Sequence, residues 1–267
     1  MIKQLSFIGT GKMASAIAGG ILRNSVLEPE HIIGTAPDSS RELFNELTGI
    51  PVSDSNLDAL NSKVVILAFK PQQAEFICRS ISESVKDQYF ISICAGITLE
   101  SLENWLGTNR VTRTMPNTPL CVSKGAVAHC SANGVTLDDK KLLETYFECS
   151  GILAEVEEED INTVTALSGS GPAYVFEMID SFAKSAEKNG LASETSLAFS
   201  IQTFLGAAQM LKEGLGTPEE LRNAVTSPNG TTHAALENFK ANNLRAVLDK
   251  GFQAAKDRGD ELSRGAK

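Results

Sequence analysis

The sequence predicts a doubly wound α/β sheet domain followed by an all-α domain. Short apolar runs rich in β-branched residues alternate with helix-length stretches in the first part of the chain, whereas helical periodicity without convincing strands follows residue 160. A glycine-rich turn at residues 9–14 stands between the first apolar run and the first helical stretch. We therefore expect a sheet domain at residues 1–160 and a helical domain at residues 161–267.

Composition limits the classes of function. Hydrophobic residues make up 42% of the 267 residues and charged residues 21%, which is enough to bury a sizeable core. The 24 Lys and Arg against 33 Asp and Glu give a net charge of −9, which excludes a broad basic surface for nucleic acid or anionic lipid. No apolar stretch approaches the roughly 20 residues of a membrane span. The strand pattern begins at once and leaves no signal peptide, so a cytoplasmic protein is expected.

The elements of the sheet domain follow the apolar runs. Strands are expected at residues 5–8, 31–33, 64–68, 90–93 and 110–113, and helices at residues 12–24, 39–47, 72–85 and 99–106. Runs of four to six apolar residues between helices are typical of parallel strands covered on both faces, joined by right-handed crossovers. A strand at residues 126–129, a helix at 137–149 and a strand at 153–156 are expected to complete the domain.

The second half reads as helices separated by turns. Helical periodicity covers residues 173–188, 194–211, 218–224, 234–241 and 244–258. The acidic run at residues 155–160 is interpreted as a solvated boundary with carboxylates in a helix's first turn, and not as a cation site. No metal site is expected, because the three histidines lie far apart in the sequence.

Five cysteines, an odd number without a CxxC pair, are interpreted as small buried hydrophobic residues. They are Cys78, Cys94, Cys121, Cys130 and Cys149. The pattern favours neither a disulfide framework nor a zinc site.

The glycine-rich turn predicts a Rossmann-type dinucleotide site. Gly9 permits a tight turn, Gly11 lets the backbone approach a pyrophosphate, and small Ala14 lets helix and strand pack closely. Lys12 and Met13 then begin a helix whose free N–H groups face the anion. A tight turn in some other α/β protein is the structural alternative.

The end of the second strand favours NADPH over NADH. An NAD site would place a carboxylate there to hold the ribose hydroxyls, but this chain has Thr35 and Ala36. Two serines and Arg41 follow shortly after, and they suit a 2′-phosphate. Asp38 is close enough in sequence to leave NADH open.

Six segments spread over nearly the whole chain form a further set of motifs: Phe7-Ile8-Gly9-Thr10-Gly11-Lys12-Met13-Ala14, Ala68-Phe69-Lys70-Pro71, Cys94-Ala95-Gly96-Ile97-Thr98, Arg113-Thr114-Met115-Pro116-Asn117-Thr118-Pro119, Ala166-Leu167-Ser168-Gly169-Ser170-Gly171-Pro172-Ala173-Tyr174 and Val225-Thr226-Ser227-Pro228-Asn229-Gly230-Thr231-Thr232. With these segments the chain resembles the pyrroline-5-carboxylate reductase family, which carries out the last step of proline synthesis. Asn229 departs from the glycine usual in the family, but Asn tolerates positive φ, so the turn is expected to survive.

The resemblance assigns a cofactor edge. Ala68, Lys70, Pro71, Ala95, Gly96 and Asn117 match its cofactor segments, and Asn56 matches a position facing the adenosine half. Lys70, Ala95, Gly96 and Asn117 each follow a predicted strand, so they would gather where open α/β sheets bind ligands. Small Ala95 and Gly96 would admit a nicotinamide ring. Lys70 as a plain surface lysine and Asn117 as a structural residue stay open as alternatives.

The helical half is expected to hold the substrate. Free amides of Gly230, Thr231 and Thr232, with Ser227, would form a carboxylate site where a helix begins. Thr232 would also bond the ring nitrogen, which makes it the candidate catalytic residue. Helix capping by Thr231 and Thr232 is the structural alternative.

The expected reaction is hydride transfer from NADPH to 1-pyrroline-5-carboxylate, giving L-proline. Rivals are another NADP-dependent imine or hydroxyacid reductase and a non-catalytic NADPH-binding protein. The first lysine after Gly171 is Lys184, which counts against the hydroxyacid enzymes, whose catalytic lysine comes earlier. The resemblance makes the helical half a dimerisation domain, so a homodimer is expected, with a decamer of five dimers as the larger assembly.

Overall fold

The computed structural model describes residues 3–36 and 40–265 and divides into two compact units. The first unit runs to Ser170 and also includes the chain from Ala255 onward, and the second spans Gly171–Ala254. This division differs from the boundary expected at residue 160. The last helix contributes its C-terminal part to the first unit, where Asn162 Nδ2 donates to Asp260 Oδ1 at 2.9 Å.

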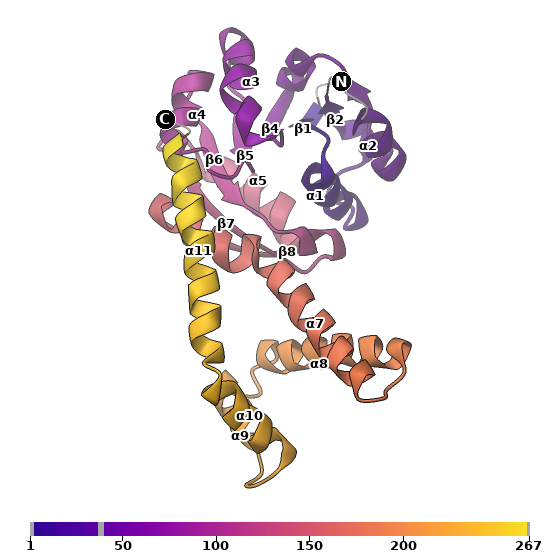
Figure 1. The fold of residues 1–267 in the computed structure, drawn as a ribbon. Helices are drawn as coiled ribbons and strands as arrows, with labels where there is room; N and C mark the ends of the chain where they lie inside the picture. The colour runs from indigo at the N-terminus through magenta and orange to yellow at the C-terminus, as the bar shows by residue number, and fades with distance from the viewer. Residues whose placement is uncertain (1–2, 37–39, 266–267) are drawn as a thin grey trace. The chain divides into compact units, whose positions relative to one another are not determined.

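The first unit is built on an eight-stranded sheet in the order β3-β2-β1-β4-β5-β6-β7-β8 (Figure 1). Its strands are β1 (Lys3–Ile8), β2 (Ile32–Thr35), β3 (Val52–Ser53), β4 (Ser62–Leu67), β5 (Tyr89–Ser92), β6 (Val111–Met115), β7 (Gly125–Ser131) and β8 (Gly151–Glu155). The order doubles back at β1 and β4, which confirms the doubly wound sheet predicted from sequence. The two-residue β3 was not expected, because it is too short to show an apolar pattern.

Two strands run against the other six. β7 pairs antiparallel with β6 and β8 pairs parallel with β7, whereas the pairings among β1–β6 are all parallel. Only residues 116–124 join β6 to β7, and a parallel return needs a crossover of roughly a dozen or more residues. The length of the connection therefore fixes this direction, which the strand pattern alone did not indicate.

Helices cover both faces of the sheet, as expected from the apolar strands (Figure 1). They are α1 (Lys12–Arg23), α2 (Ser40–Thr48), α3 (Ala74–Ile81), α4 (Leu99–Leu106), α5 (Leu137–Phe147) and α6 (Ile161–Val164). One core cluster joins Phe7 and Ile66 to Ile17 of α1, and a second joins Val65 and Phe90 to α3 and α4 on the other face. A sheet buried on both sides explains why its strands read as continuous apolar runs.

The second unit is helical, and its residues contain no strand. It consists of α7 (Gly171–Lys188), α8 (Ser193–Lys212), α9 (Pro218–Ala224), α10 (Thr231–Ala241) and the first part of α11 (Leu244–Gly265). Before α7, Thr165–Gly169 form a turn of π-helix that the sequence did not indicate. Within the described ranges, no helix combines the length and the apolar character needed to cross a bilayer.

Two expectations about individual side chains need correction. Cys78, Cys94 and Cys130 are buried, but Cys121 is exposed at a 3-10 turn, so it is not a core residue. The acidic run is not simply solvated, because Glu158 accepts hydrogen bonds from the buried Arg113 guanidinium at 3.0 Å and from Leu99 N at 2.7 Å. Glu158 therefore offsets a cation that would otherwise be buried alone.

Candidate functional site

The turn after β1 requires glycine at its first position. Gly9 has φ +97°, and its N–H donates to Thr35 O at 2.8 Å. A Cβ at Gly9 would lie 2.6 Å from Ala68 O, closer than any side chain tolerates. Gly9 thus lets the ends of β1 and β4 meet, which is a requirement of the protein itself.

Gly11 is different, because no neighbour among the described residues requires glycine at this position. It is the N-cap of α1 with φ −76°, and a Cβ built there meets no atom within 4 Å. The space in front of the α1 N-terminus is open, while Lys12 is exposed and Met13 half-buried. This arrangement fits a pyrophosphate that approaches the backbone at Gly11 and receives hydrogen bonds from the first N–H groups of α1.

The end of β2 carries a threonine whose hydroxyl is fixed by an asparagine. Thr35 Oγ1 donates to Asn56 Oδ1 at 2.9 Å, and Thr35 and Ala36 are both buried. This places Asn56 beside the position where an NAD site carries its carboxylate. Asp38 and Ser39 lie outside the described residues, and Arg41 is half-buried.

The turns after β4 and β5 are linked by Cys94. Its thiol donates to Phe69 O at 3.4 Å, which joins the Ala68–Pro71 segment to the Cys94–Gly96 turn. Burial raises the pKa of the Cys94 thiol to about 12, so this cysteine is a structural link and not a nucleophile. Ala68 and Pro71 are half-buried and Lys70 is exposed, which leaves its ammonium accessible to a ligand.

The environment of Gly96 was not foreseen. Gly96 has φ +76°, and a Cβ there would lie 3.2 Å from Leu262 Cβ of α11. Leu262 of α11 therefore lies on the side of Gly96 to which a side chain would point, whereas Ala95 is half-buried. The positive φ and the close approach of α11 already account for glycine at this position.

Asn117 follows β6 at the same edge, but both ends of its amide already have protein partners. Nδ2 donates to Ser168 O at 3.1 Å, and Oδ1 accepts from Ala126 N at 2.9 Å. With 7% of its surface exposed, Asn117 favours the structural alternative over cofactor contact.

The candidate substrate loop lies in the second unit and leads into α10. Asn229 has φ +60°, which confirms that asparagine keeps the left-handed turn. The amide of Gly230 is not free as expected, because it donates to Ser227 O at 3.0 Å. The first bond of α10 runs from Ala234 N to Gly230 O, so the N–H groups of Thr231 and Thr232 have no partner within the helix.

The two threonines do not cap the helix. The N-cap of α10 is Gly230, and no side-chain cap bond is made there. Thr232 is half-buried, while Thr231 and Ser227 are exposed. The geometry therefore leaves both hydroxyls available to a ligand, against the capping alternative.

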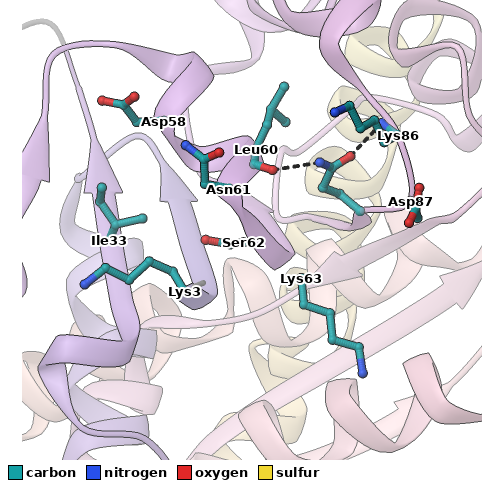
Figure 2. A pocket seen from close by; sticks show the side chains of 10 residues that line it. Lys3, Ile33, Asp58, Leu60, Asn61, Ser62, Lys63, Lys86 and Asp87 are labelled. Atoms are coloured by element: carbon teal, nitrogen blue, oxygen red, sulfur yellow. Dashed lines mark hydrogen bonds between the residues drawn. The ribbon is translucent and has the colours of Figure 1, made fainter. Parts of the chain in front are cut away.

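The two described cavities lie at opposite edges of the sheet, and only one of them is near the predicted cofactor residues. A cavity of about 450 Å³ is lined by Thr10, Gly11 and Lys12 together with residues of α2. A cavity of about 820 Å³ lies where β1, β4 and β5 begin, and Figure 2 shows Lys3, Lys63 and Lys86 there with Asp58 and Asp87. None of the predicted site residues lines the second cavity, because it lies at the opposite ends of the strands.

The two halves of the chain match two protein families. Residues 158–262 match the family described as pyrroline-5-carboxylate reductase dimerisation. Residues 4–96 match the family described as NADP oxidoreductase, coenzyme F420-dependent.

Matches to individual proteins extend over nearly the whole chain. Pyrroline-5-carboxylate reductase of Pseudomonas aeruginosa is 39% identical over 97% of this chain and 97% of its own, and pyrroline-5-carboxylate reductase 2 of Bacillus subtilis is 37% identical over 95% and 90%. The crystal structure of the Plasmodium falciparum pyrroline carboxylate reductase with NADP bound has a TM-score of 0.90 at 30% identity, covering 98% of both chains. The chain belongs to the pyrroline-5-carboxylate reductase family.

Proposed function

We propose that this protein reduces 1-pyrroline-5-carboxylate to L-proline with a hydride from NADPH, the last step of proline synthesis. The observation that carries the proposal is the match to curated reductases of this name over 95% and 97% of the chain, which includes both units. Neither a lone dinucleotide-binding domain nor a lone helical domain accounts for a match of that extent.

The cofactor would lie along the carboxyl edge of the sheet. Gly9, Gly11, Lys12 and Met13 would hold the pyrophosphate at the α1 N-terminus, and the open space at Gly11 supports this role. The remaining contacts assigned to the dinucleotide come from Thr35, Ala36, Asn56, Ala68, Lys70, Pro71, Ala95 and Gly96.

Three observations support NADPH as the cofactor. No carboxylate stands at Thr35 or Ala36, Arg41 follows α2's first residue, and the similar Plasmodium structure holds NADP. We expect kcat/KM to be higher with NADPH than with NADH. A clear preference for NADH would contradict this assignment.

The substrate would bind at the start of α10. Its carboxylate would accept hydrogen bonds from the Thr231 and Thr232 amides and the Ser227 hydroxyl, while Gly230 shapes the turn. The Thr232 hydroxyl would bond the ring nitrogen. Since a cyclic imine is partly protonated near neutrality, these residues need only orient an activated iminium and exclude water. NADPH, when bound, supplies the hydride to the C=N carbon.

The two alternative functions, a hydroxyacid dehydrogenase and a non-catalytic NADPH-binding protein, differ from the reductase in what they require of the helical unit. A hydroxyacid dehydrogenase needs a lysine at its reacting centre, but Lys184 of α7 is exposed and pairs with Asp180. A coupled assay with pyrroline-5-carboxylate, 3-hydroxy acids and other cyclic imines separates these activities. Oxidation of NADPH only with pyrroline-5-carboxylate is expected, whereas tight NADPH binding without turnover would indicate a non-catalytic protein.

The proposal extends to assembly and location. The dimerisation family match supports a homodimer, and we propose a decamer of five dimers as its larger form. The five free cysteines suit the reducing cytoplasm. Light scattering at several concentrations tests the assembly, and a fully active monomer would contradict it.

A further inference from the structure

The side chain of Asn117 joins three segments of the first unit. Its Nδ2 donates to Ser168 O in the π-helical turn, and its Oδ1 accepts from Ala126 N at the start of β7. A backbone N–H only donates and a carbonyl only accepts, so these partners fix the orientation of the amide. With 7% exposure, the side chain has little surface left for other partners.

The Ser168 carbonyl lacks its usual helical hydrogen bond because of a proline in the sequence. In an α-helix it would accept from the N–H four residues later, but that residue is Pro172, which has none. The local turn instead closes with a wide bond from Ser170 N to Thr165 O at 2.8 Å. Ser168 is half-buried, and its carbonyl is thus left without a helical partner, so the Asn117 side chain supplies the hydrogen bond instead.

The same contact joins two motifs that are distant in sequence. Gly169 also lies against Met115, because a Cβ at Gly169 would be 2.6 Å from Met115 Cε. Met115 ends β6 and Asn117 follows it, so the π-helical turn lies where β5 and β6 end, the edge at which open sheets bind ligands.

We propose that Asn117 is a positioning residue for the reductase reaction: it holds the Thr165–Ser170 turn at the carboxyl edge of the sheet without touching the cofactor. This role replaces the direct cofactor contact expected from sequence. The inference rests on the proposed function for its kinetic readout, but the hydrogen bond itself is tested separately.

The central experiment compares Asn117→Asp with wild type across pH. The aspartate keeps the acceptor for Ala126 N but places a carboxylate against the Ser168 carbonyl. We expect kcat to fall by about 10- to 100-fold near pH 8, as for a small displacement of reacting groups. The Kd for NADPH should stay within about twofold of wild type, since no cofactor contact is lost.

Protonation should rescue this variant. A protonated carboxyl can donate to Ser168 O, and burial raises the pKa of an aspartate. The kcat ratio of variant to wild type should therefore rise as pH falls from about 8 to about 5.5. Asn117→Ala, which offers no donor at any pH, should show the loss without the rescue. Asn104→Asp, on the exposed surface of α4, is the matched control and should behave as wild type.

A second rescue comes from the backbone. Pro172→Ala restores an N–H four residues after Ser168, so the kcat loss caused by Asn117→Ala should shrink in the double variant.

Hydrogen exchange of the 165–174 segment should be faster in Asn117→Ala even if the protein proves to reduce another substrate, which separates this inference from the proposed function. Wild-type kcat in both Asn117 variants, or a tenfold rise in NADPH Kd with kcat unchanged, would overturn the positioning role. Hydrogen exchange of residues 165–174 that is the same in Asn117→Ala as in wild type would also overturn the role.

Discussion

The two units of this chain bury their apolar side chains to very different degrees. The first unit has core clusters on both faces of its sheet, with Phe7, Phe44, Phe90 and Phe147 fully covered. In the second unit only Ala183 and Ser196 are buried. Its exposed large apolar residues include Phe176, Phe182, Leu197, Phe199, Ile201, Leu205, Met210, Leu211, Val225 and Val247.

The first unit therefore has a hydrophobic core of its own, whereas the second unit buries almost none of its large apolar side chains. α7 and α8 pack together, with the Phe182 and Phe204 rings 5.7 Å apart, but the second unit itself does not cover their other apolar faces. Exposed apolar surface of this extent marks an interface. Together with the dimerisation family match, this supports a second copy of the chain as the covering partner.

The largest effect is expected from charges on that face. Phe199→Glu combined with Leu205→Glu should convert the oligomer to monomers and reduce kcat/KM by more than about 100-fold, because a buried unpaired charge is costly at an interface. Both side chains are more than half exposed in the single chain, at 67% and 58%, so the fold of the unit itself should persist. Light scattering and circular dichroism check the two expectations.

Phe76→Glu provides the control in the first unit. Phe76 of α3 is 78% exposed, and its substitution should change neither the mass of the oligomer nor the reductase activity. Retention of the oligomer in the Phe199→Glu, Leu205→Glu variant would refute the comparison between the two units.

The next prediction compares alanine substitutions at two glycines of the first unit, which should affect different properties. Gly9→Ala should destabilise the protein by about 2–4 kcal/mol, since it combines a positive φ with a backbone clash. Gly11→Ala should leave the Tm within about 2 °C but raise the NADPH Kd by about tenfold or more, because only the ligand needs that space. Thermal unfolding and NADPH fluorescence titration give the two readouts. Equal losses of stability would show that Gly11 is also structural.

A smaller effect is expected at the substrate loop of the second unit. Thr232→Ala should lower kcat/KM for pyrroline-5-carboxylate by about 10- to 100-fold, as for one lost polar contact. Thr145→Ala on α5 is a suitable control, because Thr145 is an exposed helical threonine bonded only to Lys141 O. Wild-type turnover by Thr232→Ala would remove the residue from the reaction.

The last comparison concerns the capping boxes at the starts of α5 and α9, one in each unit. In α5, Thr136 and Asp139 cap each other, and Arg110 donates to both Asp139 oxygens at 2.7 and 2.6 Å. Burial raises the pKa of Asp139, but the Arg110 and Thr136 hydrogen bonds outweigh it and hold that pKa below its usual value. Asp139→Asn should cost about 2 kcal/mol of unfolding free energy at neutral pH.

The pH dependence of that cost follows from the direction of the shift. A carboxyl with a lowered pKa in the folded state contributes its full stabilisation above its unfolded pKa of about 3.9, and loses it as pH falls through the folded value. The gap between wild type and Asp139→Asn should therefore close below about pH 4. Glu220→Gln in the exposed α9 box is the control, and urea unfolding should show a smaller change there. A constant gap across pH would contradict the ionic origin.

Much of the first unit could be predicted from its apolar pattern, because strands buried on both faces leave continuous runs in the sequence. The direction of β7 could not, since it depends on the short connection after β6. The link from Thr35 to Asn56 and the ion pair from Arg113 to Glu158 join residues far apart in the chain, and no local pattern announces them.

The candidate site stays a prediction, which the structure supports at some residues and not at others. The glycine turn and the start of α10 lie at strand and helix ends, where local sequence decides the geometry. Gly96 and Asn117 were assigned to the cofactor because they match segments of the family and follow strands, but their partners, Leu262 and Ser168, come from distant segments. The position of a residue along a strand predicts the edge of the sheet at which it lies. It does not predict which residues contact it there.

By itself, the sequence determined the alternation of strands and helices, the glycine turn, the family and the helical second half, because these depend on local periodicity and contiguous motifs. Only the tertiary structure decided which groups are already engaged by the protein. It distinguished Gly9, required by the chain, from Gly11, open to a ligand, and it placed Asn117 on a carbonyl that Pro172 leaves without a partner. Such distinctions depend on contacts between segments distant in sequence, which form only when the chain folds.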